Sequence, residues 1–355
     1  MNHPTTPSSG QRQTPAEEQL AKLKMYMSAG VPANTQAAYR SAINDFCNEW
    51  GGRLPATPRD VCLYIVSRAE QHKPSTIALR LSCISTWHQV QGMPDPTKDA
   101  SVKLTLKGVR KVHPHKPKQA RPMTHAELRQ IVEALDRAHK AAVEAQNYVE
   151  AMICLRDKAL VLVAFWRAFR SDELSSMRAE FVSADKRKGM EIFLPSSKTD
   201  KEAKGLTFFV PAFAELCPVK AYSDWIEVAG ITSGPVFSRV LPNALLSGKP
   251  LRPSSIADIL RANYKRAGID PSGISTHSMR RGFAHWAVGQ KWNARGLMDY
   301  VGWKDIKNAS KYMPAVHGFG EMALSFGSDE LMTPVRVGNC LPGTPGRELP
   351  REDQA

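Results

Sequence analysis

Apolar residues recur at helical spacing along most of this chain, and that period constrains its fold more than any other feature of the sequence. Tyr39, Ile43 and Phe46 share a stripe with Trp50, which we expect to face a core. The nearly all-apolar run at residues 159–166 predicts a helix at the centre of a larger core. Elsewhere two short runs, at 191–194 and 206–210, have strand character and are joined by a basic loop. The sequence thus predicts a mainly α protein with a small β-sheet.

The first of two expected domains spans residues 16–112 and is a bundle of short helices. Thr57 and Pro58 supply an N-cap and a first helical residue, and Ser75 is the expected cap of the next helix. Residues 96–109 are expected to form a fourth helix. Four short helices with brief connections describe a compact domain. A chain of 355 residues leaves room for a second domain.

The second expected domain spans residues 123–327. Thr124 and Glu127 have the spacing of a capping box at the start of a helix. After the two strand-like runs, the pattern returns to helix from Pro218 onwards, and only residues 236–237 have strand character. This second domain therefore contains the predicted sheet.

Both termini have the composition of disordered segments. Residues 1–15 are rich in Pro, Ser, Thr and Gly, which predicts a flexible arm, and residues 328–355 are expected to be a disordered tail. The six cysteines include no CxxC pair, so a zinc module and a disulfide framework are both disfavoured, and a reducing compartment is expected. No export signal or membrane-spanning run is indicated, so we expect a cytoplasmic protein.

The charge of the chain points to a polyanionic partner. Its 48 Lys and Arg residues against 34 Asp and Glu residues give a net charge of +14. Nucleic acid is the first candidate, an anionic membrane is the second, and a solvated cationic surface is the alternative to both. Residues 113–122 are expected to be a basic linker between the domains. The candidate phosphate contacts in and before this linker are Lys103, Lys107, Arg110, Lys111, Lys116, Lys118 and Arg121.

Three short motifs carry chemistry. His277 and Arg280 lie one turn apart on a predicted helix, and such a pair suits an oxyanion. Arg170 precedes a helix whose Glu173 can orient its guanidinium or simply cap the first turn. Tyr312 follows Gly302-Trp303 in a short helical segment expected at residues 306–313. A tyrosine is an able nucleophile when a base takes its proton and arginines neutralise the phosphate it attacks.

These spaced residues resemble the signature of the tyrosine recombinase, or phage integrase, family of site-specific DNA recombinases. The resemblance implies a helical core-binding (SAM-like) domain followed by a tyrosine recombinase catalytic domain. In this sequence Trp303 stands where many members carry histidine, although other members also carry tryptophan. The matched positions are Arg170, Glu173, Lys198, His277, Arg280, Trp303 and Tyr312.

The resemblance also implies a mechanism without metal or other cofactor. Arg170 and Arg280 would hold the scissile phosphate while Tyr312 forms a 3′-phosphotyrosine. His277 would accept the tyrosine proton, and Lys198 would protonate the departing 5′ oxygen, with Lys201 and Lys204 as alternatives on the same loop. Trp303 can donate its indole N–H but cannot act as a base. Arg281 and His285 lie off the spacing of the motif and are interpreted as structural.

The partners implied by the resemblance are a double-stranded DNA recombination site, three further copies of the chain in a tetramer on DNA, and accessory or directionality proteins. A nucleoid-associated location follows from such a role. Apolar residues after the nucleophile, which are expected to dock on a neighbouring copy or to pack within the chain, are Phe319, Met322, Leu324 and Phe326. Two alternative functions are a type IB topoisomerase-like nicking-closing enzyme and a catalytically silent DNA-binding factor. Phage, transposon, plasmid and chromosomal settings all remain open.

Overall fold

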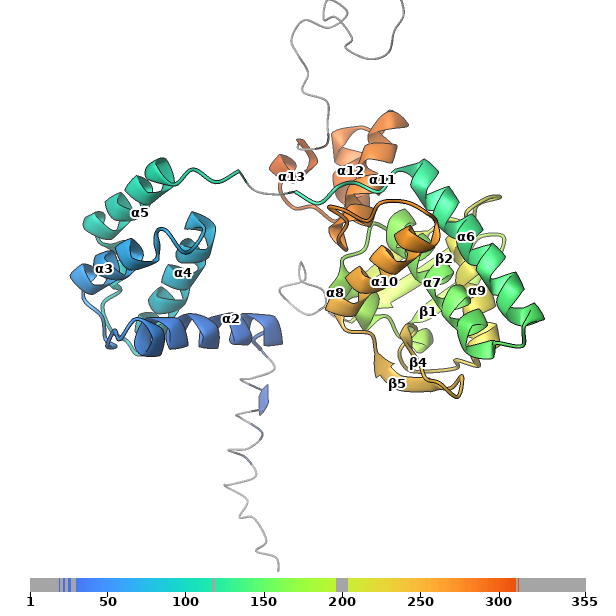
Figure 1. The fold of residues 1–355 in the computed structure, drawn as a ribbon, viewed down its shortest axis with the longest axis horizontal. Helices are drawn as coiled ribbons and strands as arrows, with labels where there is room; N and C mark the ends of the chain where they lie inside the picture. The colour runs from blue at the N-terminus through green and yellow to red at the C-terminus, as the bar shows by residue number, and fades with distance from the viewer. Residues whose placement is uncertain are drawn as a thin grey trace, which may run out of the picture. The chain divides into compact units, whose positions relative to one another are not determined.

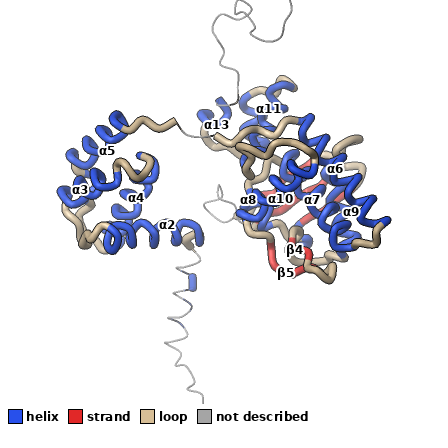
Figure 2. Tube along the Cα trace, viewed as in Figure 1, coloured by secondary structure: helices blue, strands red, loops and turns tan. Residues whose placement is uncertain are grey.

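The computed structural model describes residues 19, 22, 25–26, 30–116, 119–195, 204–310 and 312. The chain divides into two compact units, Met1–Lys118 and Gln119–Ala355, whose elements are labelled in Figure 1. Figure 2 shows that helices make up most of the described chain and strands a small part, which confirms the mainly α class with a small sheet. The expected arm at residues 1–15 and the expected tail at residues 328–355 lie outside the described residues.

The first unit is built from helices with a few tight connections between them. They are α2 (Ala33–Asn44), a π-helical turn (Asp45–Glu49), α3 (Pro58–Arg68), α4 (Pro74–Val90), a 3₁₀ turn (Pro96–Lys98) and α5 (Ala100–Val112). Thr57 caps α3 as predicted, because its hydroxyl accepts the N–H of Asp60 at 3.2 Å and its own N–H donates to the Asp60 carboxylate at 2.9 Å. Pro58 is the first helical residue.

The core of the first unit gathers around Phe46, which is completely buried. Ile43 and Trp50, from the predicted stripe, pack against this core, whereas Tyr39 is only half-buried. Burial of the stripe and of the apolar faces of α3, α4 and α5 therefore holds this unit together.

Two predicted helix boundaries in the first unit were wrong. Helix α4 begins at Pro74, with Lys73 in the N-cap position, so Ser75 lies inside the helix rather than capping it. Proline is favoured at the first helical position, where its missing N–H costs nothing. Residues 96–109 do not form one helix, because the carboxylate of Asp99 accepts the N–H of Ser101 at 2.8 Å and caps a new helix, α5, at that point.

The second unit is organised around α7 (Tyr148–Trp166), a central helix whose second half, from Ala159 onwards, is entirely apolar. Every side chain from Ala159 to Trp166 is buried, as the sequence predicted. This helix packs against α6 (His125–Glu144), α9 (Pro218–Ala229) and α11 (His277–Gly289). Helix α6 begins with the predicted capping box, in which the Glu127 N–H donates to the Thr124 hydroxyl at 3.1 Å.

A three-stranded antiparallel sheet lies beside this helical core. Its strands β1 (Val182–Asp185), β2 (Gly189–Leu194) and β3 (Leu206–Val210) follow one another in sequence, and Ile192 pairs with both Val182 and Phe208. Strands β2 and β3 match the two predicted runs. No strand signal in the sequence predicted β1, because its four residues lack an alternating apolar face.

A second, two-stranded sheet pairs β4 (Ser238–Val240) with β5 (Leu246–Pro250). The prediction of a strand at residues 236–237 was wrong, because these buried residues lie just before β4 and not in it. Their backbone groups bond outside the hairpin instead: the N–H of Val236 donates to Met177 O, and Phe237 O accepts from Leu251 N–H, both at 2.9 Å. Buried backbone groups require such partners.

The remaining elements of the second unit are helical. They are α8 (Ser171–Ser176), a 3₁₀ turn (Ala179–Phe181), α10 (Pro253–Arg266), α12 (Ala294–Val301) and α13 (Ile306–Ser310). The helix expected at residues 306–313 is shorter than predicted, and Tyr312 lies in a turn beyond Ser310. Among helices in the described part of the chain, none has the length and apolar character needed to cross a membrane.

Candidate active site

A tight turn after α7 carries the first candidate arginine. Ala168 in this turn has a φ of +55°, which is uncommon for a residue with a side chain. Helix α8 starts directly after Arg170, whose Nη1 donates to the Glu173 carboxylate at 2.6 Å. The other carboxylate oxygen accepts the Arg170 backbone N–H at 2.8 Å. One buried glutamate therefore both caps α8 and orients the guanidinium.

Arg280 lies on α11 and is almost fully buried, with 5% of its surface exposed. Its Nη1 donates to Ala168 O at 2.6 Å and its Nη2 donates to Val301 O at 2.9 Å. Burial, followed by the positive charge of Arg170, lowers the pKa of Arg280 to about 9. The group therefore remains a cation at neutral pH, held rigidly by two carbonyls from different segments.

His277 is the first residue of α11 and is exposed, one turn before Arg280. Its backbone N–H donates to the hydroxyl of Ser275 at 3.2 Å. The spacing predicted from the sequence is thus present, with one imidazole at the surface and one guanidinium beneath it. This arrangement suits a proton acceptor beside a bound anion.

Tyr312 lies against Trp303, and their rings are stacked with centroids 5.0 Å apart and planes at 6°. The guanidinium of Arg280 lies 5.6 Å from the centre of the Trp303 ring. Trp303 therefore stands between the buried arginine and the candidate nucleophile, and its flat surface positions the tyrosine.

Arg281 and His285, which were interpreted from the sequence as structural residues, also contact the candidate nucleophile. The guanidinium carbon of Arg281 lies 5.2 Å from the centre of the Tyr312 ring, and His285 meets that ring edge-on at 5.6 Å. Burial, followed by the charge of Arg281, lowers the pKa of His285, so its imidazole is neutral at pH 7. The signal that could have found both is their spacing of four residues, which puts them on one helical face.

Arg167 is a third buried cation that sequence reasoning missed. Its guanidinium lies 4.4 Å from the Phe208 ring centre and 4.5 Å from that of Tyr300, and it donates to the Tyr300 carbonyl. Burial lowers its pKa. Within the described residues its Nε and that of Arg281 are buried without a hydrogen-bond partner. Arg167 thus adds positive potential behind Arg170 and Arg280.

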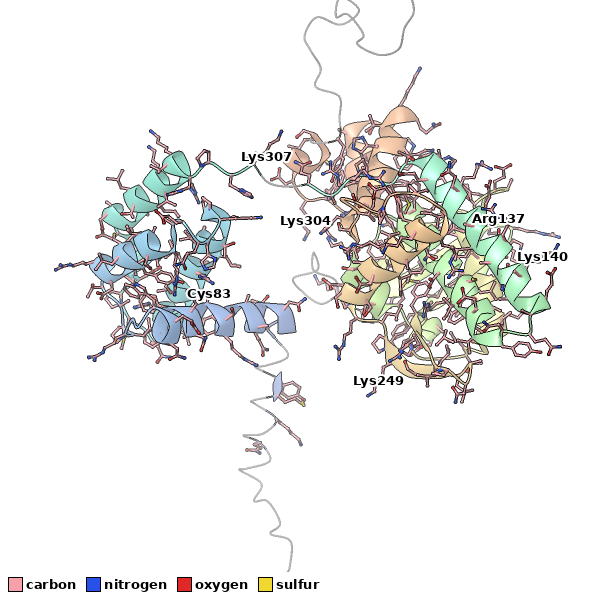
Figure 3. The ribbon with its side chains drawn as sticks, in the orientation of Figure 1. Cys83, Arg137, Lys140, Lys249, Lys304 and Lys307 are labelled. Carbon is pink, nitrogen blue, oxygen red and sulfur yellow. The ribbon has the colours of Figure 1, made fainter. Side chains whose placement is uncertain are left out.

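The remaining predicted residues are distributed unevenly. Lys198, Lys201 and Lys118 lie outside the described residues, as do the apolar positions after residue 312, while Lys204 is described and exposed. Five linker-associated cations have exposed side chains: Lys103, Lys107, Arg110, Lys111 and Lys116. Two further exposed lysines, Lys304 and Lys307, lie at and just before α13, close in sequence to Tyr312 (Figure 3).

Arg121 differs from the other predicted DNA contacts. Its guanidinium forms an ion pair with Glu127 and donates to the carbonyls of Asp270 and Ser272. These groups all belong to the second unit. Each of its three guanidinium nitrogens thus donates to an acceptor within this unit, and the phosphate contact expected for Arg121 stays a prediction.

The chain is similar in sequence and fold to known integrases and recombinases. A model of the phage integrase family matches residues 121–316, more than half of the chain. An integrase/recombinase xerD homolog from Selenomonas ruminantium is 28% identical over 313 residues, covering 86% of this chain and 88% of the relative. Recombinase cre of Escherichia phage P1 is 23% identical over 281 residues, covering 75% and 77%. The structure of a lambda integrase tetramer bound to a Holliday junction has a TM-score of 0.54 at 15% identity, covering 89% of this chain and 80% of that one.

Proposed function

The chain belongs to the phage integrase family, and on that premise we propose which of its residues cut and rejoin DNA. The protein is a tyrosine site-specific recombinase. One observation carries the assignment of residues: a rigid, buried Arg280 within the electrostatic reach of Arg170, beside a Trp303 that holds Tyr312 by stacking. This arrangement combines an anion site with a nucleophile.

In the proposed reaction the Tyr312 oxygen attacks the scissile phosphorus. A bond forms between that oxygen and phosphorus, the bond to the 5′ oxygen breaks, and a 3′-phosphotyrosine remains. Arg170 and Arg280 contact the non-bridging oxygens, whose negative charge grows in the transition state. Since Glu173 and two backbone carbonyls fix these guanidiniums beforehand, little reorganisation accompanies the reaction.

Two proton transfers complete the proposed step. His277 accepts the proton of Tyr312, and a lysine from the loop between β2 and β3 protonates the leaving 5′ oxygen. Lys198 is our choice for that lysine, with Lys201 and Lys204 as alternatives. Reversal of the same step by the 5′ hydroxyl of another strand restores the DNA backbone and frees Tyr312.

We propose double-stranded DNA as the partner of both units. The exposed cations on and after α5 support phosphate contacts, because each neutralised phosphate releases counterions. Assembly as a tetramer is supported by the fold shared with the lambda integrase tetramer. Accessory proteins and a cytoplasmic, nucleoid-associated site of action belong to this proposal as well.

Covalent trapping tests the proposal. Nicked duplexes tiled across the DNA that flanks the encoding gene would be incubated with the wild type and with Tyr312→Phe, and denaturing gels would reveal protein–DNA adducts. We expect an adduct with the wild type and none with Tyr312→Phe. Tyr300→Phe is the matched control, because burial raises the Tyr300 pKa to about 12 and its hydroxyl already donates to Trp166 O at 2.7 Å. It should still form the adduct.

Two results would contradict the assignment. An adduct with Tyr312→Phe would move the nucleophile to another residue. Sequence-specific binding without any adduct in the wild type would favour the catalytically silent DNA-binding function instead.

A further inference from the structure

We propose that Arg121 is a positioning residue for the recombination reaction, acting through the segment that leads into α11. This inference rests on the proposed function, because α11 supplies His277 and Arg280. Arg121 contacts neither the candidate phosphate site nor Tyr312, and it lies at the very start of the catalytic unit. Its effect on chemistry would be indirect, through the placement of the two residues that handle the phosphate and the proton.

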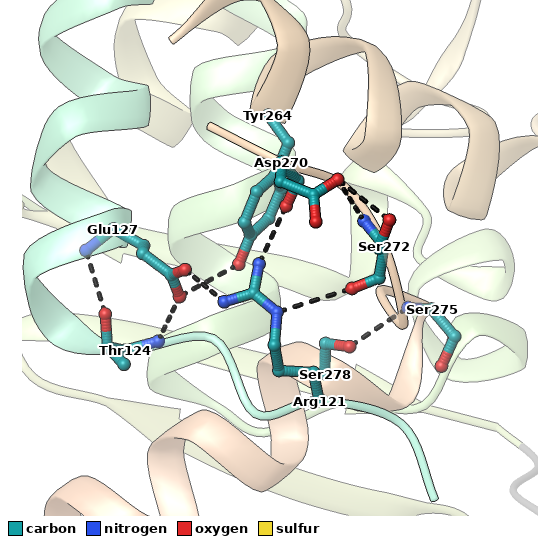
Figure 4. Close-up of polar contacts among 8 residues, drawn as sticks. All are labelled: Arg121, Thr124, Glu127, Tyr264, Asp270, Ser272, Ser275 and Ser278. Atoms are coloured by element: carbon teal, nitrogen blue, oxygen red, sulfur yellow. Dashed lines mark hydrogen bonds and ion pairs between the residues drawn. The ribbon is translucent and has the colours of Figure 1, made fainter. Parts of the chain in front are cut away.

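The guanidinium of Arg121 bridges two segments that are far apart in sequence (Figure 4). Its Nη2 donates to Asp270 O at 2.9 Å and its Nε donates to Ser272 O at 3.4 Å. The backbone N–H of Arg121 adds a bond to Gly273 O, also at 2.9 Å. Three bonds thus hold the carbonyls of residues 270, 272 and 273, in the segment that precedes the catalytic helix.

The other side of the guanidinium is held by an ion pair with Glu127 (Figure 4). The same carboxylate accepts the Thr124 N–H at 2.8 Å and the Tyr264 hydroxyl at 3.3 Å. The Tyr264 ring lies beneath the guanidinium, 5.4 Å from its carbon atom to the ring centre. The hydrogen bond that Arg121 donates to Glu127 is also the main cause of the raised pKa of Arg121. The cation is therefore fixed from several directions within its own unit.

The chain beyond Arg121 reaches the catalytic helix directly. The Met123 N–H donates to Ser278 O at 2.9 Å, in the first turn of α11. The Ser278 hydroxyl in turn accepts the Ser275 N–H at 3.0 Å, as Figure 4 shows. His277 lies between these two bonded serines, and Arg280 follows Ser278 by two residues. Loosening the Arg121 end of this chain of bonds should therefore displace both candidate site residues.

A lysine cannot reproduce these contacts. The planar guanidinium donates hydrogen bonds to Glu127, Asp270 and Ser272 through three different nitrogens, whereas an ammonium is a single point charge. Misplacement of a catalytic group by about 1 Å can cost roughly 100-fold in rate. Arg121→Lys, which keeps the charge, therefore separates positioning from a simple charge effect on DNA.

The experiment measures DNA affinity and chemistry separately on the duplex that the trapping assay selects. Four variants would be compared with the wild type: Arg121→Gln, Arg121→Lys, Lys107→Gln and Arg129→Gln. Lys107→Gln is the reference for loss of a phosphate contact, since it should reduce the slope of log affinity against log salt by about 0.9. Arg129→Gln is the matched control, because Arg129 lies on α6 and forms only an exposed ion pair with Glu215, which precedes α9.

We expect both Arg121 variants to slow single-turnover cleavage at saturating DNA by about 10- to 100-fold, while their salt slope stays that of the wild type. Arg129→Gln should match the wild type in both measurements. A second substrate distinguishes positioning from general loss of structure. A methylphosphonate at the scissile position removes the charge that Arg280 neutralises, so the Arg121 penalty should shrink on it, whereas a general structural defect would slow both substrates equally.

Three outcomes would overturn the inference: cleavage at the wild-type rate in both Arg121 variants, a salt slope reduced as in Lys107→Gln, or an equal penalty on both substrates. If Arg121→Gln does not fold, Arg121→Lys gives the same comparison. Absence of any wild-type adduct is a separate result, because it would refute the proposed function and the inference with it.

Discussion

Gly282 offers a sharp test of how α11 is held. A methyl group at this position would lie 2.0 Å from the carbonyl oxygen of Met123 and 3.0 Å from the Phe165 ring. Gly282→Ala must therefore push the backbone of Met123 away by about 1 Å, since a carbon and an oxygen normally approach to about 3.3 Å. The displacement also threatens the bond from the Met123 N–H to Ser278 O.

The magnitude follows from three contributions. Overpacking costs about 1–3 kcal/mol and the lost hydrogen bond about 0.5–1.5 kcal/mol, while alanine in a helix regains about 1 kcal/mol relative to glycine. The net destabilisation is therefore about 2 kcal/mol, which lowers the melting temperature of a unit of this size by about 4–8 °C. Cleavage should slow as well, because the displaced turn carries His277 and Arg280.

Differential scanning calorimetry would measure the transition of the catalytic unit. Gly289→Ala is the matched control, because Gly289 ends the same helix and nothing lies within 4 Å of its added methyl group. That variant should melt at or slightly above the wild-type temperature. The reasoning is refuted if Gly282→Ala melts like Gly289→Ala.

Three further predictions concern other parts of the second unit. Asp157→Ala should lower the unfolding free energy in urea by about 3–5 kcal/mol, because it leaves the buried Arg156 without the carboxylate bonded at 2.6 and 2.9 Å; a loss below about 1 kcal/mol would contradict this. Burial, followed by the charge of Arg129, lowers the pKa of His125 from its usual 6.5, so the unfolded chain takes up this proton first and stability falls as pH drops below about 6.5. His125→Gln should therefore lose less stability than the wild type between pH 7.5 and 5.5 in urea titrations, and equal losses would refute the assignment. Trp303→Ala should slow adduct formation about 10-fold through lost stacking on Tyr312 while Trp303→Phe retains most of the rate, and similar rates for both variants would exclude a stacking role.

Local patterns in the sequence determined the helical class and several helix starts. Thr57 and Thr124 each combine a capping side chain with a carboxylate three residues later, and both capping boxes are present. Such signals depend on neighbours within one turn, so they can be read without knowing the fold. The helix starts near Ser75 and Asp99 were harder to predict, because two residues that can begin a helix lie within a few positions of each other.

The spacing of three residues placed Glu173 within reach of Arg170, whereas only the family resemblance implied that Arg280 lies near them. The structure brings all three into electrostatic range. The sequence could not show what holds Arg280. The acceptors of Arg280 are the carbonyls of Ala168 and Val301, which lie in segments far from Arg280 in sequence. Backbone carbonyls also carry no sequence signal, since every residue has one.

Arg121 shows most clearly what the tertiary structure decided. In the sequence it is one more cation at the end of a basic run, and its charge alone suggested DNA. In the folded chain it faces Glu127 and the carbonyls of residues 270 and 272, which the chain brings together only when α10 and α11 pack beside the start of α6. The sequence by itself determined the residue types that a recombinase needs and their helical periods, both of which are local properties. Which cations form ion pairs and hydrogen bonds inside the protein depended on long-range packing, because only that packing sets the partners of each guanidinium.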